Sequence, residues 1–184
     1  MQSSIPALAA LAKGIGDPQV RNRGTIGGSV ANNDPAADYP SAVLALGATV
    51  ITSKREIKAD DFFQGLFTTA LEPGELIVKI SFPVPKKAAY AKFPHPASGY
   101  AMAGVFIADT GSGIRVAVTG AGASGVFRWT EAEAALAKSA NADAIAKLAV
   151  AADDLNEDIH GSREYRAQLV KVMAGRAAAA LAGK

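Results

Sequence analysis

The chain has 184 residues and a mass of 18.8 kDa, which is room for one domain or two small ones. Apolar residues make up 49% and charged residues 20%, and no apolar run is long enough to cross a bilayer, so the composition indicates a globular chain without a membrane span. A net charge of +2 does not favour a nucleic-acid binder. The absence of cysteine excludes a thiol nucleophile, a disulfide and an iron–sulfur cluster ligated by this chain.

The first segment predicts a helix. Ser4 is expected to cap it, Pro6 lies in its first turn and Gly14 ends it. No basic region precedes this apolar stretch, so a signal peptide is not expected. We therefore expect a cytoplasmic protein.

The most informative segment spans residues 16–40, which reads as one long passage of loops. Gly27 and Gly28 permit positive φ and close backbone approach, so the neighbouring amides can converge on an anion such as a pyrophosphate. A tight turn between packed strands explains the same glycine pair equally well. Arg21 and Arg23 flank the segment, either as partners of an anion or of another protein's acids, or as solvated surface charges.

A carboxylate follows the glycines. Asp34 and Pro35 form a cap and first-turn pair, and Pro40 interrupts the turn that they begin. A second helix from Pro40 to Leu46 leaves Asp38 at a junction, where it can accept hydrogen bonds from ribose or polyol hydroxyls. A phosphate is repelled by a carboxylate and is expected nearer the glycines. An ordinary helix cap is the alternative role for Asp38.

Short β-branched runs predict strands in the next part of the chain. Residues 48–53 and 55–59 form a predicted hairpin, and residues 75–82 form a further strand. Asp60 is expected to cap a brief helical turn between them.

Two prolines and two lysines at residues 83–87 mark a predicted domain boundary. It divides the chain into a first domain of residues 1–84 and a second of residues 85–184. Strands followed by helices in the second domain are typical of an α+β fold. Its strands are predicted at residues 88–93, 100–109, 114–119 and 126–129.

Three helices are predicted after these strands. Thr130 and Glu133 match a capping box, in which each side chain satisfies an amide at the helix start. Asn141 is expected to cap a second helix that runs to Val150, and Ser162 to cap a third.

Signatures of several enzyme classes are missing from the sequence. There is no phosphate-binding loop of the Walker type, no glycine-rich dinucleotide fingerprint after a strand and no nucleophile elbow, so phosphoryl transfer, a Rossmann fold and serine hydrolysis lack support. His95 and His160 have neither a second imidazole nor an acidic cluster at ligand spacing, and we expect structural roles for both. Trp129 is expected in the core or at an interface.

Together these segments resemble the FAD-binding subunit of molybdenum hydroxylases, and in particular the medium subunit of aerobic carbon monoxide dehydrogenase and the FAD-binding subunit of xanthine dehydrogenase. The strongest matches are the run IGDPQVRNRGTIGGS at residues 15–29 and DPAAD at residues 34–38. The resemblance continues as ELI at residues 75–77, ASGYA at 97–101, VAVTG at 116–120 and DIHGSREYR at 158–166.

The resemblance implies an α+β chain, with a partial FAD-binding subdomain of the PCMH-like kind and then a C-terminal domain of antiparallel sheet plus helices, like that of carbon monoxide dehydrogenase flavoproteins. It implies that the Thr-x-Gly-Gly segment holds the FAD pyrophosphate, that Asp38 contacts sugar or ribityl hydroxyls, and that the strand with Leu76 lies against the isoalloxazine. Lys92 is a weaker candidate near the ring, with a solvated strand lysine as the alternative. No catalytic residue and no metal are expected. The implied cofactor residues are Thr25, Gly27, Gly28, Ser29, Asn32, Asp38, Leu76, Ile77 and Lys92.

The implied role is electron transfer within an oxidoreductase. Electrons come from iron–sulfur clusters on a small subunit and pass through FAD to an external acceptor, while the substrate is oxidised on a molybdopterin-containing large subunit. A dimer of such heterotrimers is the implied assembly, and neither nucleic acid nor a membrane takes part.

The sequence departs from the family in one respect. Members of the family also carry an N-terminal FAD subdomain with a second glycine-rich loop of the Ala-Gly-Gly-x-Ser type, and no such loop occurs here. We therefore expect that half of the cofactor cradle is missing and that FAD binding by this chain is weakened or lost. One alternative is a cofactor-free fragment that acts only in assembly. Another is a general anion- or nucleotide-binding protein that uses Gly27 and Gly28.

Overall fold

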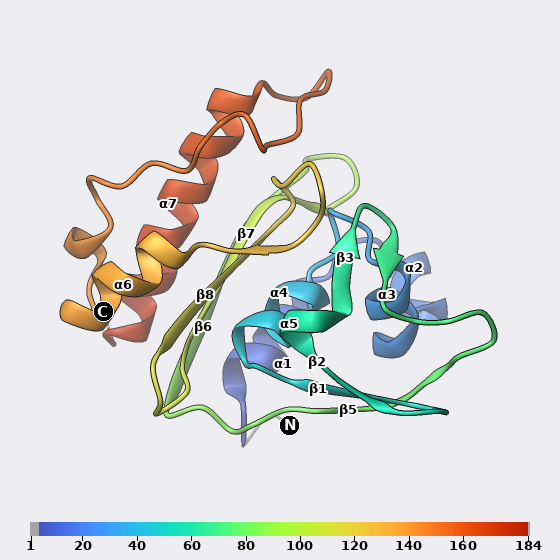
Figure 1. Cartoon of the computed structure of the whole chain (residues 1–184). Coiled ribbons are helices and arrows are strands. Elements are labelled where there is room, and N and C mark those ends of the chain that lie inside the picture. Colours follow the sequence, from blue (N-terminus) through green and yellow to red (C-terminus); the bar gives the residue numbers. More distant parts are fainter. Residues whose placement is uncertain (1–3, 184) are drawn as a thin grey trace.

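The structure is a computed structural model and describes residues 4–183. Its central element is an antiparallel sheet in the order β6-β7-β8-β9 (Figure 1). The four predicted strands are confirmed. The strands are β6 (Lys87–Pro94), β7 (Ala101–Asp109), β8 (Ile114–Thr119) and β9 (Phe127–Arg128).

The sheet is buried on both faces, because β7 places apolar side chains alternately on each side. Val105 and Ile107 belong to one hydrophobic cluster, whereas Phe106 and Ala108 belong to the other. The helices that cover these two faces therefore pack on opposite sides of one sheet.

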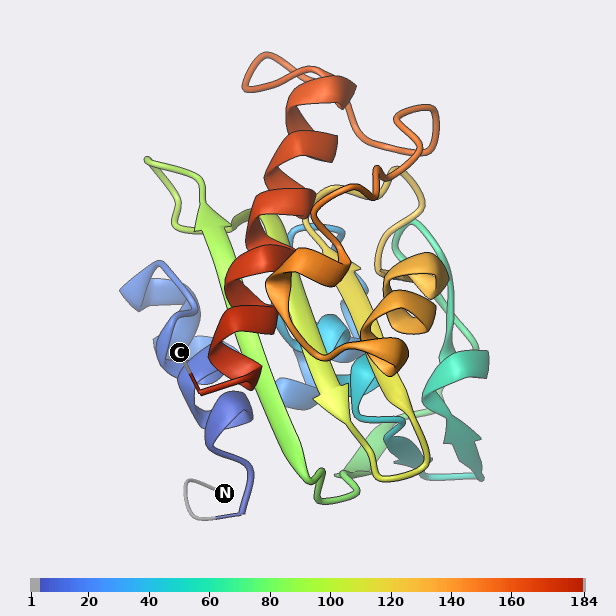
Figure 2. The ribbon, with the colours of Figure 1, turned by 90° about the vertical axis from the view of Figure 1, so that its left-hand side faces the viewer.

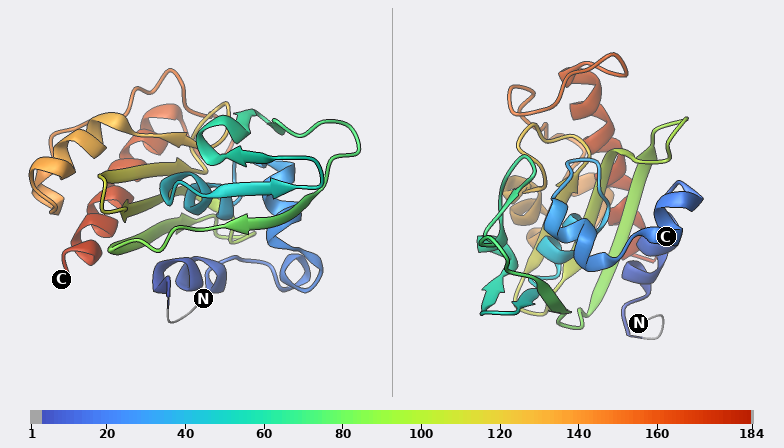
Figure 3. Two further views of the ribbon diagram at one scale, coloured as in Figure 1. Left: turned by 60° about the horizontal axis from the view of Figure 1, so that its bottom comes forward. Right: turned by 90° about the vertical axis from the view of Figure 1, so that its right-hand side faces the viewer.

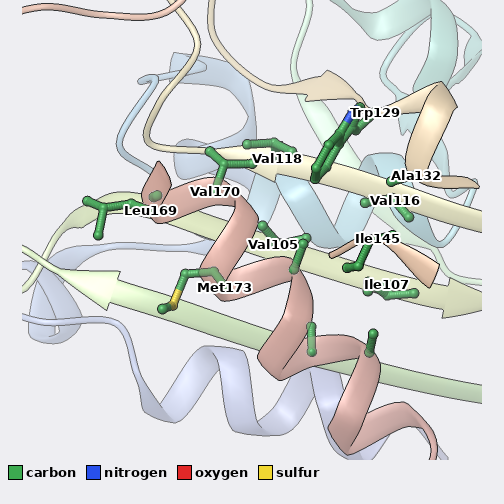
Figure 4. Close-up of a cluster of buried hydrophobic side chains, with 14 of the residues drawn as sticks. Val105, Ile107, Val116, Val118, Trp129, Ala132, Ile145, Leu169, Val170 and Met173 are labelled. Carbon is green, nitrogen blue, oxygen red and sulfur yellow. The ribbon is translucent and has the colours of Figure 1, made fainter. Parts of the chain in front are cut away.

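The first face is covered by α6 (Thr130–Lys138), the 3₁₀ turn η1 (Ala142–Ala144) and α7 (Arg163–Leu181). Figure 2 shows α7 lying across the strands of the sheet. Trp129, Leu169 and Met173 pack against the strand residues in this cluster (Figure 4). Ser162 caps α7 as predicted, with its Oγ accepting from the Tyr165 amide at 3.3 Å.

The other two helix starts differ from the prediction. Trp129 stands at the N-cap of α6 without a side-chain bond, and Glu133 accepts instead from the Val116 amide and from Arg128, so the capping box is wrong. Asn141 does act as a cap, but only of η1, and the predicted helix through Val150 does not form.

The second face is covered by α1 (Pro6–Lys13), α4 (Tyr39–Ala45) and α5 (Ala59–Phe62). Beyond α4 lies a small sheet in the order β2-β1-β5, whose inward residues include Val50 and Ile57 (Figure 3). The predicted hairpin and the predicted third strand are confirmed. Its strands are β1 (Thr49–Thr52), β2 (Glu56–Lys58) and β5 (Ile77–Ser81).

Two predicted caps in this half are wrong. Ile5, and not Ser4, occupies the N-cap of α1, which ends at Gly14 as predicted. Asp60 lies inside α5 and pairs with Arg115 at 2.6 Å and with Arg128 at 3.4 Å. Its carboxylate therefore joins α5 to the central sheet.

The chain connects the two sheets through residues 82–86, where the domain boundary is predicted. The second hydrophobic cluster spans this connection, since Leu8, Val43 and Phe62 share it with Phe106 and Ala117. The boundary itself stays a prediction. Among residues 4–183, no helix is both long enough and apolar enough for a membrane span.

Candidate functional site

A pocket of about 540 Å³ opens between α1 and the segment predicted to be loop. That segment forms two short helices, α2 (Pro18–Arg23) and α3 (Ile26–Asn32). Asp38 and Tyr39 border the pocket at the start of α4, and Tyr100 borders it from the turn between β6 and β7. Of the predicted cofactor residues, the pocket is lined by Thr25, Gly28, Ser29, Asn32 and Asp38.

The N-terminus of α3 supplies the donors at one end of this pocket. Thr25 is its N-cap, and its Oγ1 accepts from the Gly28 amide at 3.0 Å. The amides of Ile26 and Gly27 have no partner among residues 4–183, as expected for the first turn of a helix. Free amides and the positive end of the helix dipole favour an anion here.

The glycine pair has a different backbone from the one predicted. Neither Gly27 nor Gly28 has a positive φ, because Thr25 starts the helix before them. The positive φ at these glycines and the tight turn between strands are therefore wrong. That the neighbouring amides bind an anion stays a prediction. A Cβ on Gly28 would meet only Thr25 Oγ1 within 4 Å, at 3.2 Å, whereas one on Gly27 would face Ile77 at 3.9 Å. Gly28 thus leaves room on the pocket side, and Gly27 lets α3 pack on β5.

Asp38 lies at the other end of the pocket and is only 3% exposed. Its Oδ1 accepts from Tyr90 Oη at 2.5 Å, and Lys92 Nζ lies 3.1 Å from Oδ1 and 3.2 Å from Oδ2. Burial raises the pKa of Asp38, and the Tyr90 bond and the Lys92 charge partly offset this effect. The side chain makes no cap bond to α4, so the helix-cap alternative is wrong.

Lys92 is not the solvated strand lysine of the alternative prediction. Its side chain is 9% exposed. Besides Asp38, its Nζ donates to Gly14 O at 2.6 Å and to Gly99 O at 3.0 Å. These contacts place a buried cation beside the pocket.

Leu76 and Ile77 do not line the pocket. Leu76, directly before β5, is 69% exposed, and Ile77 packs against α3 in the second hydrophobic cluster. Their contact with the flavin ring stays a prediction. The Leu76 backbone is held by Ser53, whose Oγ accepts from the Leu76 amide at 3.2 Å and whose amide donates to Leu76 O at 2.8 Å. The preceding Glu75 carboxylate accepts from Thr52 at 2.6 Å and from Arg55 at 3.2 Å.

Several residues near the pocket were not predicted from the sequence. Tyr90 could have been found, because it lies two residues before Lys92 and so faces the same side of β6. Arg21, predicted as an anion partner, an acid partner or a surface charge, is exposed and lines the pocket. Its Nη1 also donates to Ala12 O at 2.5 Å and to Ile15 O at 3.2 Å, so it ties α2 to the end of α1. A contact with an anion stays a prediction.

The two histidines lie together. The rings of His95 and His160 meet edge to face with centroids 4.3 Å apart, so the fold brings together two imidazoles that have no ligand spacing in the sequence. Their structural roles stay a prediction. Ser98 Oγ and the amide of Ala97 lie 3.3 Å and 3.2 Å from His95 Nδ1. Among residues 4–183, no three acidic or histidine side chains are grouped so that they could hold a metal ion.

Comparison with known proteins gives consistent matches. Residues 1–85 match the family described as FAD binding domain in molybdopterin dehydrogenase. The glyceraldehyde dehydrogenase medium chain of Sulfolobus acidocaldarius is 38% identical over 96% of this chain and 68% of its own length. The carbon monoxide dehydrogenase medium chain of Hydrogenophaga pseudoflava is 33% identical over 96% of this chain and 67% of its own length.

Solved structures agree with these relatives. Quinoline 2-oxidoreductase from Pseudomonas putida 86 aligns with a TM-score of 0.83 and 28% identity over 99% of this chain and 68% of its own. The Cu,Mo-CO dehydrogenase aligns with a TM-score of 0.82 and 31% identity over 96% of this chain and 67% of its own. The chain thus spans about two thirds of the length of these proteins. The α+β fold is confirmed, and the chain belongs to the FAD-binding medium subunits of molybdenum hydroxylases, which are subunits of oxidoreductase complexes.

Proposed function

We propose that this chain binds FAD in the pocket between α1, α3 and the start of α4. The observation that carries the proposal is the distribution of polar groups along the pocket: free helix amides lie at one end and a buried carboxylate at the other. In this arrangement the pyrophosphate lies at the N-terminus of α3, and the sugar or ribityl hydroxyls lie near Asp38.

The residues of the pocket fit such a ligand. Ile26 and Gly27 offer amides, and Ser29 and Asn32 add neutral polar side chains on the pocket side of α3. Gly28 leaves the space that a side chain would fill. Asp38 already accepts from Tyr90 and Lys92, which fix the position of its carboxylate. A hydroxyl of the ligand can donate a further hydrogen bond to it.

The contact of the ring with Leu76 and Ile77 belongs to the same proposal. Leu76 is one of the most exposed large apolar residues among residues 4–183, and a flat ring or a partner surface that covers it buries apolar area. The backbone of this segment is fixed by Glu75, which also accepts from the Glu72 amide at 2.8 Å.

Within a complete complex, we propose that the chain serves electron transfer. Bound FAD supplies the redox chemistry, with electrons arriving from iron–sulfur clusters on a small subunit and leaving to an external acceptor. A large subunit with the molybdenum cofactor, a dimer of heterotrimers and a cytoplasmic location complete the proposal. The chain's own residues bind and orient the cofactor, and none has to move a proton.

The first test is flavin content. The purified chain is incubated with excess FAD, freed of unbound ligand and denatured, and the released flavin is measured by absorbance and fluorescence. About one FAD per folded chain supports the proposal. A folded chain without flavin contradicts it and favours a cofactor-free assembly role, whereas ADP that binds as tightly as FAD favours a general nucleotide-binding role.

A charge variant tests the placement of the phosphates. Ser29→Asp puts a negative charge at the pocket end of α3, where an acidic residue does not destabilise the helix itself. We expect at least a tenfold loss of FAD affinity, since this corresponds to about 1.4 kcal/mol. Ser112→Asp, in the exposed loop between β7 and β8, is the matched control and should bind FAD like the unmodified chain. Equal affinity of both variants would contradict the proposed phosphate position.

A further inference from the structure

Lys92 joins three segments that are far apart in the chain. Its Nζ donates to Gly14 O at the end of α1, to Gly99 O in the turn between β6 and β7, and to Asp38 at the start of α4. Each acceptor lies in or beside a segment that lines the pocket, which Ile15, Tyr100 and Asp38 border. The side chain therefore lies behind the pocket wall and connects its parts.

The two backbone acceptors lie where two segments meet closely. A Cβ on Gly16 would lie 2.7 Å from Gly99 Cα and 2.7 Å from Ser98 O. Gly99 itself has φ +71°. Only glycine at both positions permits this approach of backbone on backbone. We call residues 14–16 and 98–100, with Lys92 between them, the lysine clasp.

The ammonium group has no donor left for a ligand. It carries three protons, and the three acceptor residues at 2.6–3.2 Å take all of them. A carboxylate and two carbonyls also compensate the buried positive charge. A cofactor that took a hydrogen bond from Lys92 would have to break one of these contacts.

We propose that Lys92 is a positioning residue, which closes the wall of the cofactor pocket by holding residues 14–16 against residues 98–100, and that it is not itself a cofactor ligand. The clasp is present without any ligand. Its effect on cofactor affinity rests on the proposed function, because the ordered wall carries Tyr100 and Asp38.

Hydrogen–deuterium exchange of the chain without FAD tests the clasp directly. Lys92→Met keeps most of the side-chain volume and removes the three bonds, so amides in residues 12–17 and 95–101 should exchange at least tenfold faster. Lys87→Met, at an exposed position of the same strand, is the matched control and should leave this exchange unchanged. Asp38→Asn retains the bonds from Lys92 to Gly14 and Gly99, and should keep both segments protected.

FAD affinity provides the second measurement. We expect Lys92→Met to weaken FAD binding at least tenfold, together with the faster exchange. Weaker binding with unchanged exchange in the ligand-free chain would mean that Lys92 contacts the cofactor, and would overturn the proposal. Unchanged exchange and unchanged binding would overturn it as well.

Two safeguards keep the test decisive. If Lys92→Met does not fold, Asp38→Asn/Lys92→Met removes both buried charges, and its exchange is compared with that of Asp38→Asn alone. Faster exchange in the double variant supports the clasp, and equal exchange overturns it. If the unmodified chain binds no FAD, the proposed function fails, but the exchange measurement still decides whether the clasp exists.

Discussion

The close approach of Gly16 and Gly99 predicts a loss of stability on substitution beyond the loss that a positive φ alone causes. Gly99→Ala places a Cβ 2.9 Å from Gly16 Cα, on a residue with φ +71°. Gly74→Ala has nearly the same backbone, with φ +73°, but its Cβ meets nothing within 4 Å. The two variants therefore share the conformational penalty, and only Gly99→Ala also forces two backbone segments apart.

The expected free energies of unfolding follow from these two contributions. The left-handed conformation costs a residue with a Cβ about 1–2 kcal/mol, and this cost applies to both variants. Overpacking adds about 1–3 kcal/mol where the neighbours are packed, and this cost applies to Gly99→Ala alone. The gain from a less flexible unfolded chain is the same for both and cancels in the comparison.

Urea unfolding followed by circular dichroism measures this difference. We expect Gly74→Ala to lose about 1–2 kcal/mol and Gly99→Ala about 2–5 kcal/mol, with similar slopes against urea. FAD affinity should fall only in Gly99→Ala. Equal losses of stability in the two variants would refute the inferred close packing of residues 16 and 99.

Three further predictions concern buried groups away from the pocket. The hydrogen bond from Arg55, and a second one from Thr52, lower the pKa of Glu75 from 4.5 to about 2. On acidification the carboxyl group is therefore protonated in the unfolded chain before it is protonated in the folded one. The contribution of Glu75 to stability is complete above pH 4.5 and should disappear as the pH falls towards 2. Glu75→Gln should flatten that part of a plot of urea midpoint against pH, and an unchanged plot would argue against the pair. Arg166→Met removes the bonds of 3.0 and 3.1 Å that the buried Met102 and Gly120 carbonyls accept from Arg166, and should cost about 2–5 kcal/mol in urea unfolding. A loss below about 1 kcal/mol would contradict its structural role. Trp129→Ala, at a residue only 3% exposed in the first hydrophobic cluster, should cost about 3–5 kcal/mol, and a near-neutral result would contradict its place in the core.

The elements that the sequence predicts well are those with local signals. Ser162 starts α7 because its hydroxyl accepts a hydrogen bond from the amide of Tyr165, three residues further along the chain. Such a cap depends on no distant residue. The strands β6 to β9 are similarly defined by apolar runs between turn residues. Both kinds of signal lie within one short stretch of chain.

The sequence predicts polar residues less well, because the sheet and not the local helix turn supplies their partners. Glu133 fits a capping box, yet it accepts from the Val116 amide in β8 and from Arg128 in β9. Asp60 fits a helix cap, yet it pairs with Arg115, which is 55 residues away. A carboxylate that is held by an arginine in this way does not accept from the backbone amides at the helix start. The sequence shows the acid but not the arginine that the sheet places beside it.

Asp38 shows how the same effect bears on function. From the sequence, its carboxylate is available to a ligand or to a helix end, whereas the structure gives it two side-chain partners on β6, 52 and 54 residues away. These partners do not make it unsuitable for a cofactor. They fix the direction of its oxygen atoms and link the start of α4 to the central sheet. The pocket is therefore built by both predicted domains, with α3 and Asp38 from the first and Tyr90, Lys92 and Tyr100 from the second. A ligand in this pocket therefore contacts residues of both, such as Asp38 and Tyr100.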